Sequence, residues 1–281
     1  MIGSISNPNR WDSELNSLPC DRYNNAELTI FLRVFLRQVN PAGGAAEGTA
    51  REWGTDPAGT GSGHGPARKI VRWTPNLWAQ WTQRYQREVQ SFWHGKFWLV
   101  PTHPMAELDF EDKGVTYRPN IWCRFELDVL DSAATAHTTI SVVRLHPSEA
   151  FFRSDSADYD NRDIEYDRGD HGGRIYRQRA HIHEVGHLLG LDHAAEGSAA
   201  CTAAGNTGAE ACYCATPDDC GNVMGAGEGV RASNASPWQK AIEAHGGGAA
   251  NLWEVKLRRH YPRTLDQVRT NQQITSWPRR G

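Results

Sequence analysis

The sequence predicts a mixed α+β fold with a sheet of several strands, a long helix behind it and further helices. Several segments of the first half have the composition or the alternation of buried strands. One segment carries aromatic residues at helical spacing, and two capping sequences mark helix starts. At 281 residues the chain is long enough for one large domain or two small ones, so we expect a core of ordinary size.

The first predicted strand and the long helix precede the other strands. Leu28–Leu36 is a run of apolar and aromatic residues typical of a buried strand. Thr74 and Pro75 predict a helix start, because threonine caps a helix N-terminus and proline is favoured at the first helical position. The face that this helix packs on the sheet is expected to consist of Trp78, Trp81, Tyr85, Val89 and Phe92.

Three more strands and a C-terminal helix complete the expected framework. The strands are Lys96–Val100, Ile121–Val129 and Thr138–Leu145. The second of them alternates apolar and polar residues, which is typical of a half-buried strand. Ser236 and Pro237 repeat the capping pattern, and the glycines at 246–248 end the helix that they begin.

Composition divides the chain into three parts. Residues 1–26 are polar and turn-rich, and have the character of a pro-segment. Residues 27–247 form the main domain, interrupted at 41–66 by a stretch of Gly, Ala, Pro, Thr and Ser that predicts a flexible insertion. Residues 248–281 form a basic, aromatic tail that packs on the domain or extends from it.

Charge and hydropathy limit the class of partner. The chain has 30 basic and 33 acidic residues, so no general affinity for nucleic acid is expected, although the basic tail could contact phosphates. No apolar run approaches the length of a membrane span, and the N-terminus lacks the pattern of a secretory signal peptide. We expect a monomer.

Four of the six cysteines are close in sequence and predict disulfides: Cys201, Cys212, Cys214 and Cys220. Three pairings are possible, and spacing does not select one. A structural zinc site is the alternative, although C-x-C at 212–214 does not match the usual ligand spacing. Clustered cysteines favour an oxidising destination, so we expect an extracellular protein or one delivered outside the producing cell. A cytoplasmic location is the alternative.

The residues that carry chemistry lie in an eleven-residue stretch that reads HEVGHLLGLDH. His183 and His187 are four residues apart, so on a helix both project from one face and can bind one metal ion. Glu184 can reach a water on that metal. Gly190 allows a left-handed exit from the helix that returns His193 as a third ligand. Three neutral nitrogens with one open position are typical of a catalytic zinc site.

The residues flanking this stretch have weaker signals. The helix that carries the motif is expected to begin near Ile175, after a turn at Gly172 and Gly173. His181 projects from a different face than the first ligand, so we expect it on the surface or beside the ligands. Asp192 is either a hydrogen-bond partner of the third ligand or a turn residue.

The stretch resembles the zinc signature of the metzincin metallopeptidases, H-E-x-x-H-x-x-G-x-x-H. That family has a Met-containing turn beneath the zinc, and Met224 lies in a matching N-V-M-G sequence downstream. A methionine that only fills a gap is the alternative. The resemblance implies that 27–247 is a zinc metallopeptidase domain with a twisted mixed sheet, a long backing helix, a zinc-site helix and a C-terminal helix. It also implies one antiparallel edge strand, Thr138–Leu145 or its neighbour, to which substrate peptide adds.

The resemblance implies a zinc-dependent endopeptidase. In that reading Zn²⁺ polarises the scissile carbonyl and activates a water, and Glu184 serves as the general base. One alternative is a secreted or injected toxin or effector whose harm is its proteolysis. The other is a zinc-bound binding module without catalysis, against which Glu184 argues, because a dead site would not need the base.

Four departures and additions leave the subfamily open. Ala226 stands where some metzincins have a tyrosine, and Ala194 stands where the best-known subfamilies have Ser or Asp. Some members stay latent through an N-terminal cysteine, a role open to Cys20, although a disulfide with Cys123 is at least as economical. Related enzymes bind Ca²⁺ near the acidic segment 147–170, but its spacing matches no defined calcium loop, so a solvated acidic loop is favoured.

Overall fold

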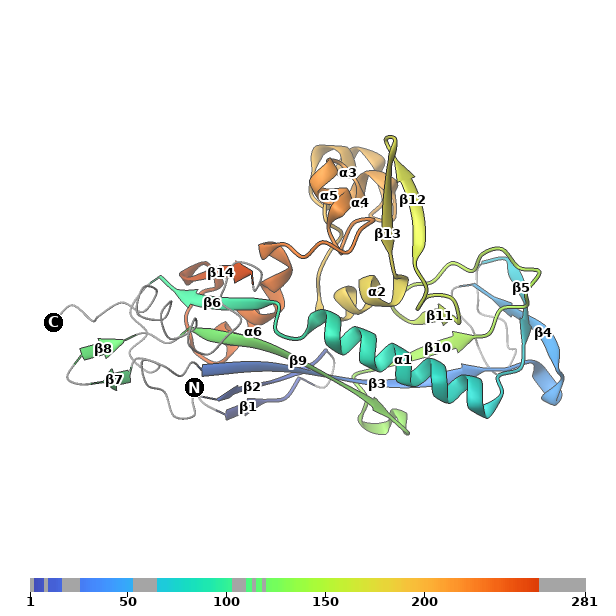
Figure 1. Ribbon diagram of the computed structural model, residues 1–281, viewed down its shortest axis with the longest axis horizontal. Helices are drawn as coiled ribbons and strands as arrows, with labels where there is room; N and C mark the ends of the chain where they lie inside the picture. The colour runs from blue at the N-terminus through green and yellow to red at the C-terminus, as the bar shows by residue number, and fades with distance from the viewer. Residues whose placement is uncertain are drawn as a thin grey trace. The chain divides into compact units, whose positions relative to one another are not determined.

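The computed structural model of the chain describes residues 3–7, 10–16, 26–52, 65–102, 110–112, 115–117 and 120–257 (Figure 1). It confirms the predicted class, because a mixed sheet is combined with several helices. The chain divides into two compact units, the first made of Met1–Leu32, Phe92–Glu126 and Val230–Gly281, the second of Arg33–Ser91 and Leu127–Gly229. Within the described ranges, no helix is both long enough and apolar enough to cross a bilayer.

The first unit is built on antiparallel strands. They are β1 (Gly3–Ile5), β2 (Asp12–Asn16), the beginning of β3 (Ala26–Val39), β6 (Phe97–Pro101), most of β9 (Ile121–Leu130) and β14 (Trp253–Leu257). A separate hairpin joins β7 (Phe110–Asp112) to β8 (Val115–Tyr117). The predicted C-terminal helix is α6 (Ser236–Ala244), preceded by the 3₁₀ turn η3 (Ala232–Ala235) and followed by η4 (Ala250–Leu252).

The core of this unit contains the large side chain of Trp238, which is fully buried. Its ring lies 5.3 Å from that of Phe97, and its Nε1–H donates to the Arg124 carbonyl at 2.8 Å. Two of the predicted parts of the chain enter the same sheet. Strand β2 comes from the N-terminal segment, and β14 comes from the basic tail, whose residues 258–281 lie outside the described ranges.

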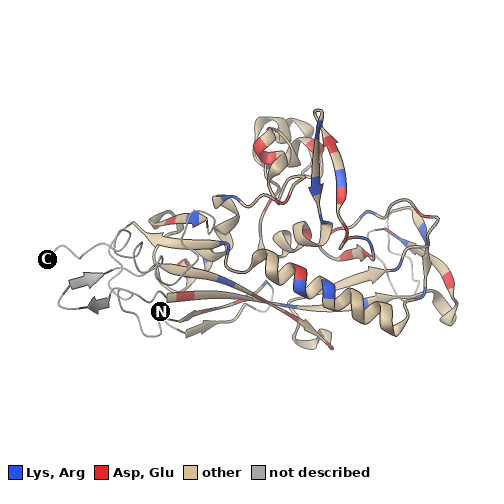
Figure 2. Ribbon diagram, in the orientation of Figure 1, with Lys and Arg blue, Asp and Glu red and all other residues tan. Residues whose placement is uncertain are grey.

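The second unit combines parallel strands with most of the helices. Its strands are the end of β3, β10 (Thr138–Val143) and β11 (Asp158–Asp160), with the hairpins β4–β5 (Glu47–Arg51, Ala67–Val71) and β12–β13 (Asp167–His171, Arg174–Gln178). Its helices are α1 (Pro75–Trp93, through Ser91), α2 (Ala180–Leu189), α3 (Ala199–Ala204), α4 (Glu210–Tyr213) and α5 (Pro217–Gly221), with 3₁₀ turns η1 (Ala42–Gly44) and η2 (Ala133–Thr135). Acidic and basic residues are interspersed along α1 and β12 (Figure 2).

Helix α1 begins at the predicted cap and buries three of the five residues of the predicted stripe, while Trp78 and Phe92 are half-buried. Trp81, Tyr85 and Val89 are buried. Tyr85 faces both β11 and α2, because its ring lies 6.0 Å from that of Tyr159 and 5.7 Å from that of His181. The stripe therefore supports the helix that carries the motif. His181 itself is fully buried, since it packs on this stripe.

The antiparallel edge strand expected at Thr138–Leu145 or its neighbour is not found, and this prediction was wrong. Strand β10 pairs in parallel with β3 on one side and with β11 on the other. The chain before β11 does not return as a strand, because Asp155 Oδ1 accepts hydrogen bonds from the backbone N–H groups of Ala157 and Asp158. Local acceptors of this kind compete with a strand ladder.

Two other expectations about local structure change. Helix α2 begins at Ala180 rather than near Ile175, because residues 174–178 pair with β12. The turn between these strands uses Gly172 and Gly173 at φ of 61° and 78°, the backbone that a two-residue hairpin requires. Within the predicted flexible insertion, Glu47–Arg51 forms β4 against β5, while residues 53–64 lie outside the described ranges.

Candidate metal centre

Helix α2 presents the first part of the motif and ends at the predicted glycine. His183, Glu184 and His187 lie on its ten residues, Ala180–Leu189. Gly190 follows in the left-handed conformation at φ 90° and ψ 30°, and its N–H bonds to carbonyls of the last turn. An L-residue with a Cβ is strained in this conformation, so glycine is favoured here. The chain then turns back and brings His193 beside the helix.

The three imidazoles converge as predicted. The Nε2 atom of His187 lies 3.1 Å from Nε2 of His183 and 3.1 Å from Nε2 of His193. Nitrogens bound to one tetrahedral zinc at about 2.0–2.1 Å would be separated by about 3.3 Å. Across the described ranges, this is the single cluster of three or more His, Cys, Asp or Glu side chains that could hold a metal ion.

The second nitrogen of each imidazole has a backbone carbonyl as its partner. The Nδ1–carbonyl distances are 2.9 Å from His183 to Val223, 2.8 Å from His187 to Leu191 and 2.7 Å from His193 to Thr207. A carbonyl only accepts, so each Nδ1 carries the proton and each Nε2 directs a lone pair to the common centre. Three lone pairs at this separation repel one another unless a cation lies among them. The donor set therefore fits a metal ion.

Burial keeps these imidazoles in the form that binds metals. Burial, together with the neighbouring His187, lowers the pKa of His183 to about 3. The same two causes lower the pKa of His193 to about 4, and burial lowers the pKa of His187. All three side chains are then neutral near pH 7, and neutral imidazole is the ligand form.

Glu184 supplies a carboxyl group from the residue that follows the first histidine. Burial raises its pKa to about 8, and the charge of Asp155 contributes to the increase. A carboxyl group whose pKa lies near neutral pH can both accept and release a proton there. This is the property required of a general base that later acts as an acid.

The loop around Met224 lies directly against the centre. Met224 is buried, its carbonyl accepts from Ala194 N–H at 2.8 Å, and Val223 supplies the acceptor for His183. A Cβ at Gly225 would lie 2.0 Å from the backbone oxygen of Asp219, so a glycine is required for this close approach. The Met224 loop thus bonds directly to His183, and it also bonds to Ala194, the residue that follows His193.

Two residues that the sequence did not single out fix this loop. The side-chain amide of Gln178 donates toward the carbonyls of Val223 at 3.1 Å and Gly225 at 2.7 Å. Arg179, at the start of α2, bonds Glu228 at 2.6 Å and Glu88 of α1 at 3.0 Å. The sequence gives no signal for either, because their partners are backbone oxygens or residues distant in the chain.

The predicted disulfides are present, and the structure selects one pairing. Cys201 bonds Cys212, and Cys214 bonds Cys220. The segment that they close supplies the Thr207 carbonyl to His193. It lies beside the β12–β13 hairpin, where His171 Nδ1 is 2.9 Å from Glu210 Oε1 (Figure 1).

The remaining cysteines and the acidic segment do not enlarge the centre. Cys123 is a buried free thiol, and Cys20, the candidate for a latency switch, lies outside the described ranges. The acidic segment 147–170 provides no Ca²⁺ site, because its described carboxylates form no cluster of three or more that could hold an ion. These carboxylates accept hydrogen bonds from residues nearby in the sequence. Asp163, for example, accepts from the Ser154 hydroxyl at 2.6 Å and from Asp160 N–H at 2.7 Å.

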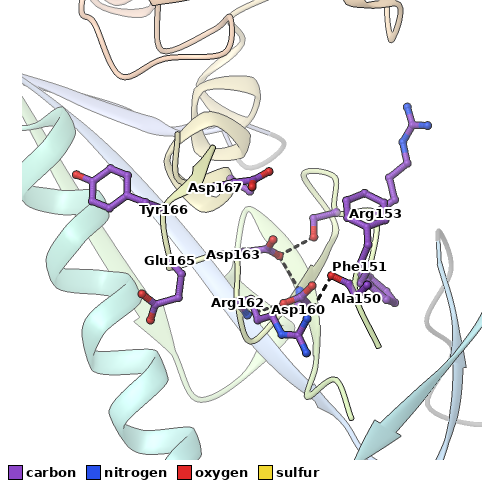
Figure 3. Close-up of a pocket in the computed structure, with 12 residues that line it drawn as sticks. Ala150, Phe151, Arg153, Asp160, Arg162, Asp163, Glu165, Tyr166 and Asp167 are labelled. Atoms are coloured by element: carbon purple, nitrogen blue, oxygen red, sulfur yellow. Dashed lines mark hydrogen bonds between the residues drawn. The ribbon is translucent and has the colours of Figure 1, made fainter. Parts of the chain in front are cut away.

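A cavity of about 400 Å³ lies at the N-terminal end of α2 (Figure 3). Ala180, Asp160 and Asp163 line it, with Phe151 and Tyr166 exposed by 55% and 54%. Burial raises the pKa of Asp160 to about 6 and that of Asp163 well above its usual range. The three histidines do not line this cavity, so it is separate from the metal centre.

Comparisons of the chain with models of protein families, with curated proteins and with solved structures found no match. The chemistry of the centre must therefore be inferred from its own residues. These are three nitrogen acceptors, a shielded carboxyl group, and the loops that hold them.

Proposed function

We propose that the protein is a zinc-dependent endopeptidase of the metzincin type, which hydrolyses peptide bonds in protein substrates. The observation that carries the proposal is the convergence of three Nε2 acceptors, two of them on the helix that also carries the buried carboxyl group of Glu184. Three neutral nitrogens with an open fourth position favour catalytic zinc over the closed sets of structural sites. The sequence motif and the buried Met224 loop add support, because both belong to the metzincin pattern.

The residues of the chain have distinct roles in this reaction. A bound zinc ion supplies a Lewis acid and lowers the pKa of its coordinated water. His183, His187 and His193 hold the ion, and the carbonyls on their Nδ1 atoms keep the rings oriented. Glu184 accepts the proton of the attacking water and then donates it to the leaving amine. A nearby cation stabilises the carboxylate form, so loading the site lowers the pKa of Glu184 from about 8.

The disulfides favour an oxidising place of action. Both disulfides of the described residues lie in the segment that holds His193, which is compatible with an extracellular protein or one delivered outside its producing cell. We propose this location together with the peptidase activity. A toxin or effector role would use the same chemistry and differ in its target.

Zinc content and cleavage, measured on the same preparations, test the proposal. We expect one zinc per chain in the wild type and cleavage of casein or of a broad peptide library. Glu184→Gln should retain zinc and lose about 10²–10⁴-fold in turnover, because it removes only the proton acceptor. Glu243→Gln, at an exposed position on α6, is the matched control and should cleave like the wild type.

A different result would point to the non-catalytic alternative. If the wild type binds zinc but cleaves no member of the library, the protein is a metal-bound binding module. If it binds no zinc, the metal centre itself is refuted.

A further inference from the structure

Tyr213 packs its aromatic ring on the third histidine of the centre. The centroids of the Tyr213 and His193 rings are 3.8 Å apart, at an interplanar angle of 35°. Tyr213 is also nearly parallel to His183, at 5.6 Å and 17°. Since the rings of His183 and His193 are stacked at 5.5 Å, the three form a set with similar orientation, and only His187 stands perpendicular to His183 and His193.

The backbone on both sides of Tyr213 is fixed. Cys212 and Cys214 flank it, and each belongs to a different disulfide. The Cys212 carbonyl accepts from Ala195 N–H at 2.8 Å, so the segment is attached just beyond His193. The Tyr213 carbonyl lies close to Gly225, where a Cβ would approach it to 2.7 Å. The ring therefore meets His193 from a rigid support.

His193 needs this support more than the other two ligands do. His183 and His187 belong to α2, and their backbone positions are set by the helix. His193 follows the left-handed exit at Gly190, where no helical hydrogen bonds restrain it. Its orientation depends on the Thr207 carbonyl and on the Tyr213 ring, and both come from the disulfide-bonded segment.

We propose that Tyr213 is a positioning residue for the third metal ligand, acting through its ring rather than its hydroxyl. The inference rests on the proposed metal centre but not on the peptidase reaction. An offset aromatic contact restricts rotation of the imidazole, so the ligand is already in place when the ion binds. Loss of the ring should weaken metal binding about three- to ten-fold, the effect of one such contact.

Two substitutions separate the ring from the hydroxyl. Tyr213→Phe keeps the ring and should match the wild type in zinc affinity, in the visible spectrum of the Co²⁺-substituted protein and in turnover. Tyr213→Leu should bind zinc about three- to ten-fold more weakly and shift the Co²⁺ spectrum, because the geometry at His193 relaxes. Tyr176→Leu is the control, since its ring contacts His171 and none of the ligands.

Several outcomes would overturn the proposal. One is a Tyr213→Leu protein with wild-type zinc affinity and Co²⁺ spectrum. Another is a Tyr213→Phe protein that binds zinc normally but turns over slowly, which would assign the role to the hydroxyl. Zinc and Co²⁺ binding need no substrate, so a wild type that binds metal without cleaving peptides would refute the peptidase and still test Tyr213.

A further measurement covers the case in which Tyr213→Leu does not fold. In this measurement 4-fluorophenylalanine replaces Tyr213, so the ring is kept and carries a fluorine atom. The ¹⁹F resonance of this residue should move when zinc is added. A resonance that does not move would show that the ring is not packed on a ligand.

Discussion

At the scale of single residues, the metal centre depends on which nitrogen of each histidine holds the proton. Backbone carbonyls of Val223, Leu191 and Thr207 determine this for the three ligands. Gln178 acts one step further out, because its amide satisfies carbonyls of the loop that holds His183. The metal centre is thus supported by hydrogen bonds that involve backbone carbonyls and Gln178, none of which is a metal ligand.

Substitution of Gln178 should affect both stability and metal binding. Gln178→Ala leaves the Val223 and Gly225 carbonyls short of a donor, at a cost of about 1–3 kcal/mol in the free energy of unfolding. Zinc affinity should fall as well, because the loop holding His183 is loosened. Gln86→Ala on α1, which removes the hydrogen bond to the Leu127 carbonyl of β9, should lower stability and leave zinc affinity unchanged. Urea unfolding measures the change in stability, and a zinc competition titration measures the change in affinity. A Gln178→Ala protein that binds zinc as tightly as the wild type would contradict the expectation.

At the scale of elements, the disulfide-bonded segment is the least regular part of the second unit and the part most involved with His193. Helices α3, α4 and α5 are short, and the two disulfides connect them. Short helices gain little stability from their own hydrogen bonds. The covalent links therefore hold Thr207 and Tyr213 where the ligand needs them.

Removing the Cys201–Cys212 disulfide should weaken zinc binding, although neither cysteine is a ligand. The double variant Cys201→Ser and Cys212→Ser should lose about 2–3 kcal/mol of stability, the effect expected for a closed loop of this size. Its zinc affinity should fall too, because the same loop carries the Thr207 carbonyl. Cys123→Ala, at the free buried thiol, should leave zinc affinity unchanged. A double variant that binds zinc as tightly as the wild type would show that the segment does not support the ligand.

At the scale of the whole molecule, every residue that we assign to the metal centre belongs to the second unit. The ligands, Glu184, the Met224 loop and the supporting helix α1 through Ser91 all lie within 33–91 and 127–229. The centre should therefore report on the folding of that unit, and its titrating groups should appear in the pH dependence of stability.

The buried histidines of the metal-free protein should contribute less and less stability as the pH falls below about 6.5. Burial lowers the pKa of His183 to about 3 and of His181 to about 4, so the unfolded chain takes up their protons first and acid favours it. Glu184, Asp160 and Asp163 act in the opposite direction, because burial raises their pKa values, to about 8 for Glu184 and to about 6 for Asp160. Their contribution to stability is therefore largest in acid and declines as the pH rises. Urea unfolding of chelator-treated protein between pH 4 and pH 8 measures the profile.

Zinc provides the control for this profile. At about 100 times its dissociation constant at pH 7, zinc should add about 2.7 kcal/mol of stability. That increment should shrink as the pH falls, because protons compete for the Nε2 atoms. A metal-free protein whose stability rises steadily as the pH falls from 6.5 to 4 would contradict the histidine contribution, because the buried carboxyl groups alone would produce that rise.

The parts of the structure that the sequence predicted are those set by local periodicity. The spacing of His183 and His187 and the exit at Gly190 follow from helix geometry, and the stripe of α1 follows from the same period. Local turn chemistry also predicts a turn at Gly172 and Gly173. The five residues that follow, RIYRQ, do not alternate apolar and polar side chains, so the sequence does not predict a strand there and places the helix start too early. The neighbours of β10 could not be deduced, because strand pairing is decided between distant segments.

The contacts that support the ligands could not be predicted from the sequence for a different reason. Tyr213 lies in an irregular segment that is held at His193 by the disulfide pairing, which spacing does not determine, and by the hydrogen bond from Ala195 N–H to the Cys212 carbonyl. The carbonyl partners of the histidines are main-chain atoms, and every residue has one.

That last feature has a consequence for how the centre tolerates change. The tautomers of the three ligands are specified by the path of the main chain, since the acceptors at 191, 207 and 223 are carbonyl oxygens. A point substitution at these positions replaces a side chain and leaves the acceptor in place. The residue types around the ligands can therefore change while the protonation state of each histidine stays the same. A comparison of side chains alone would not detect these carbonyl contacts.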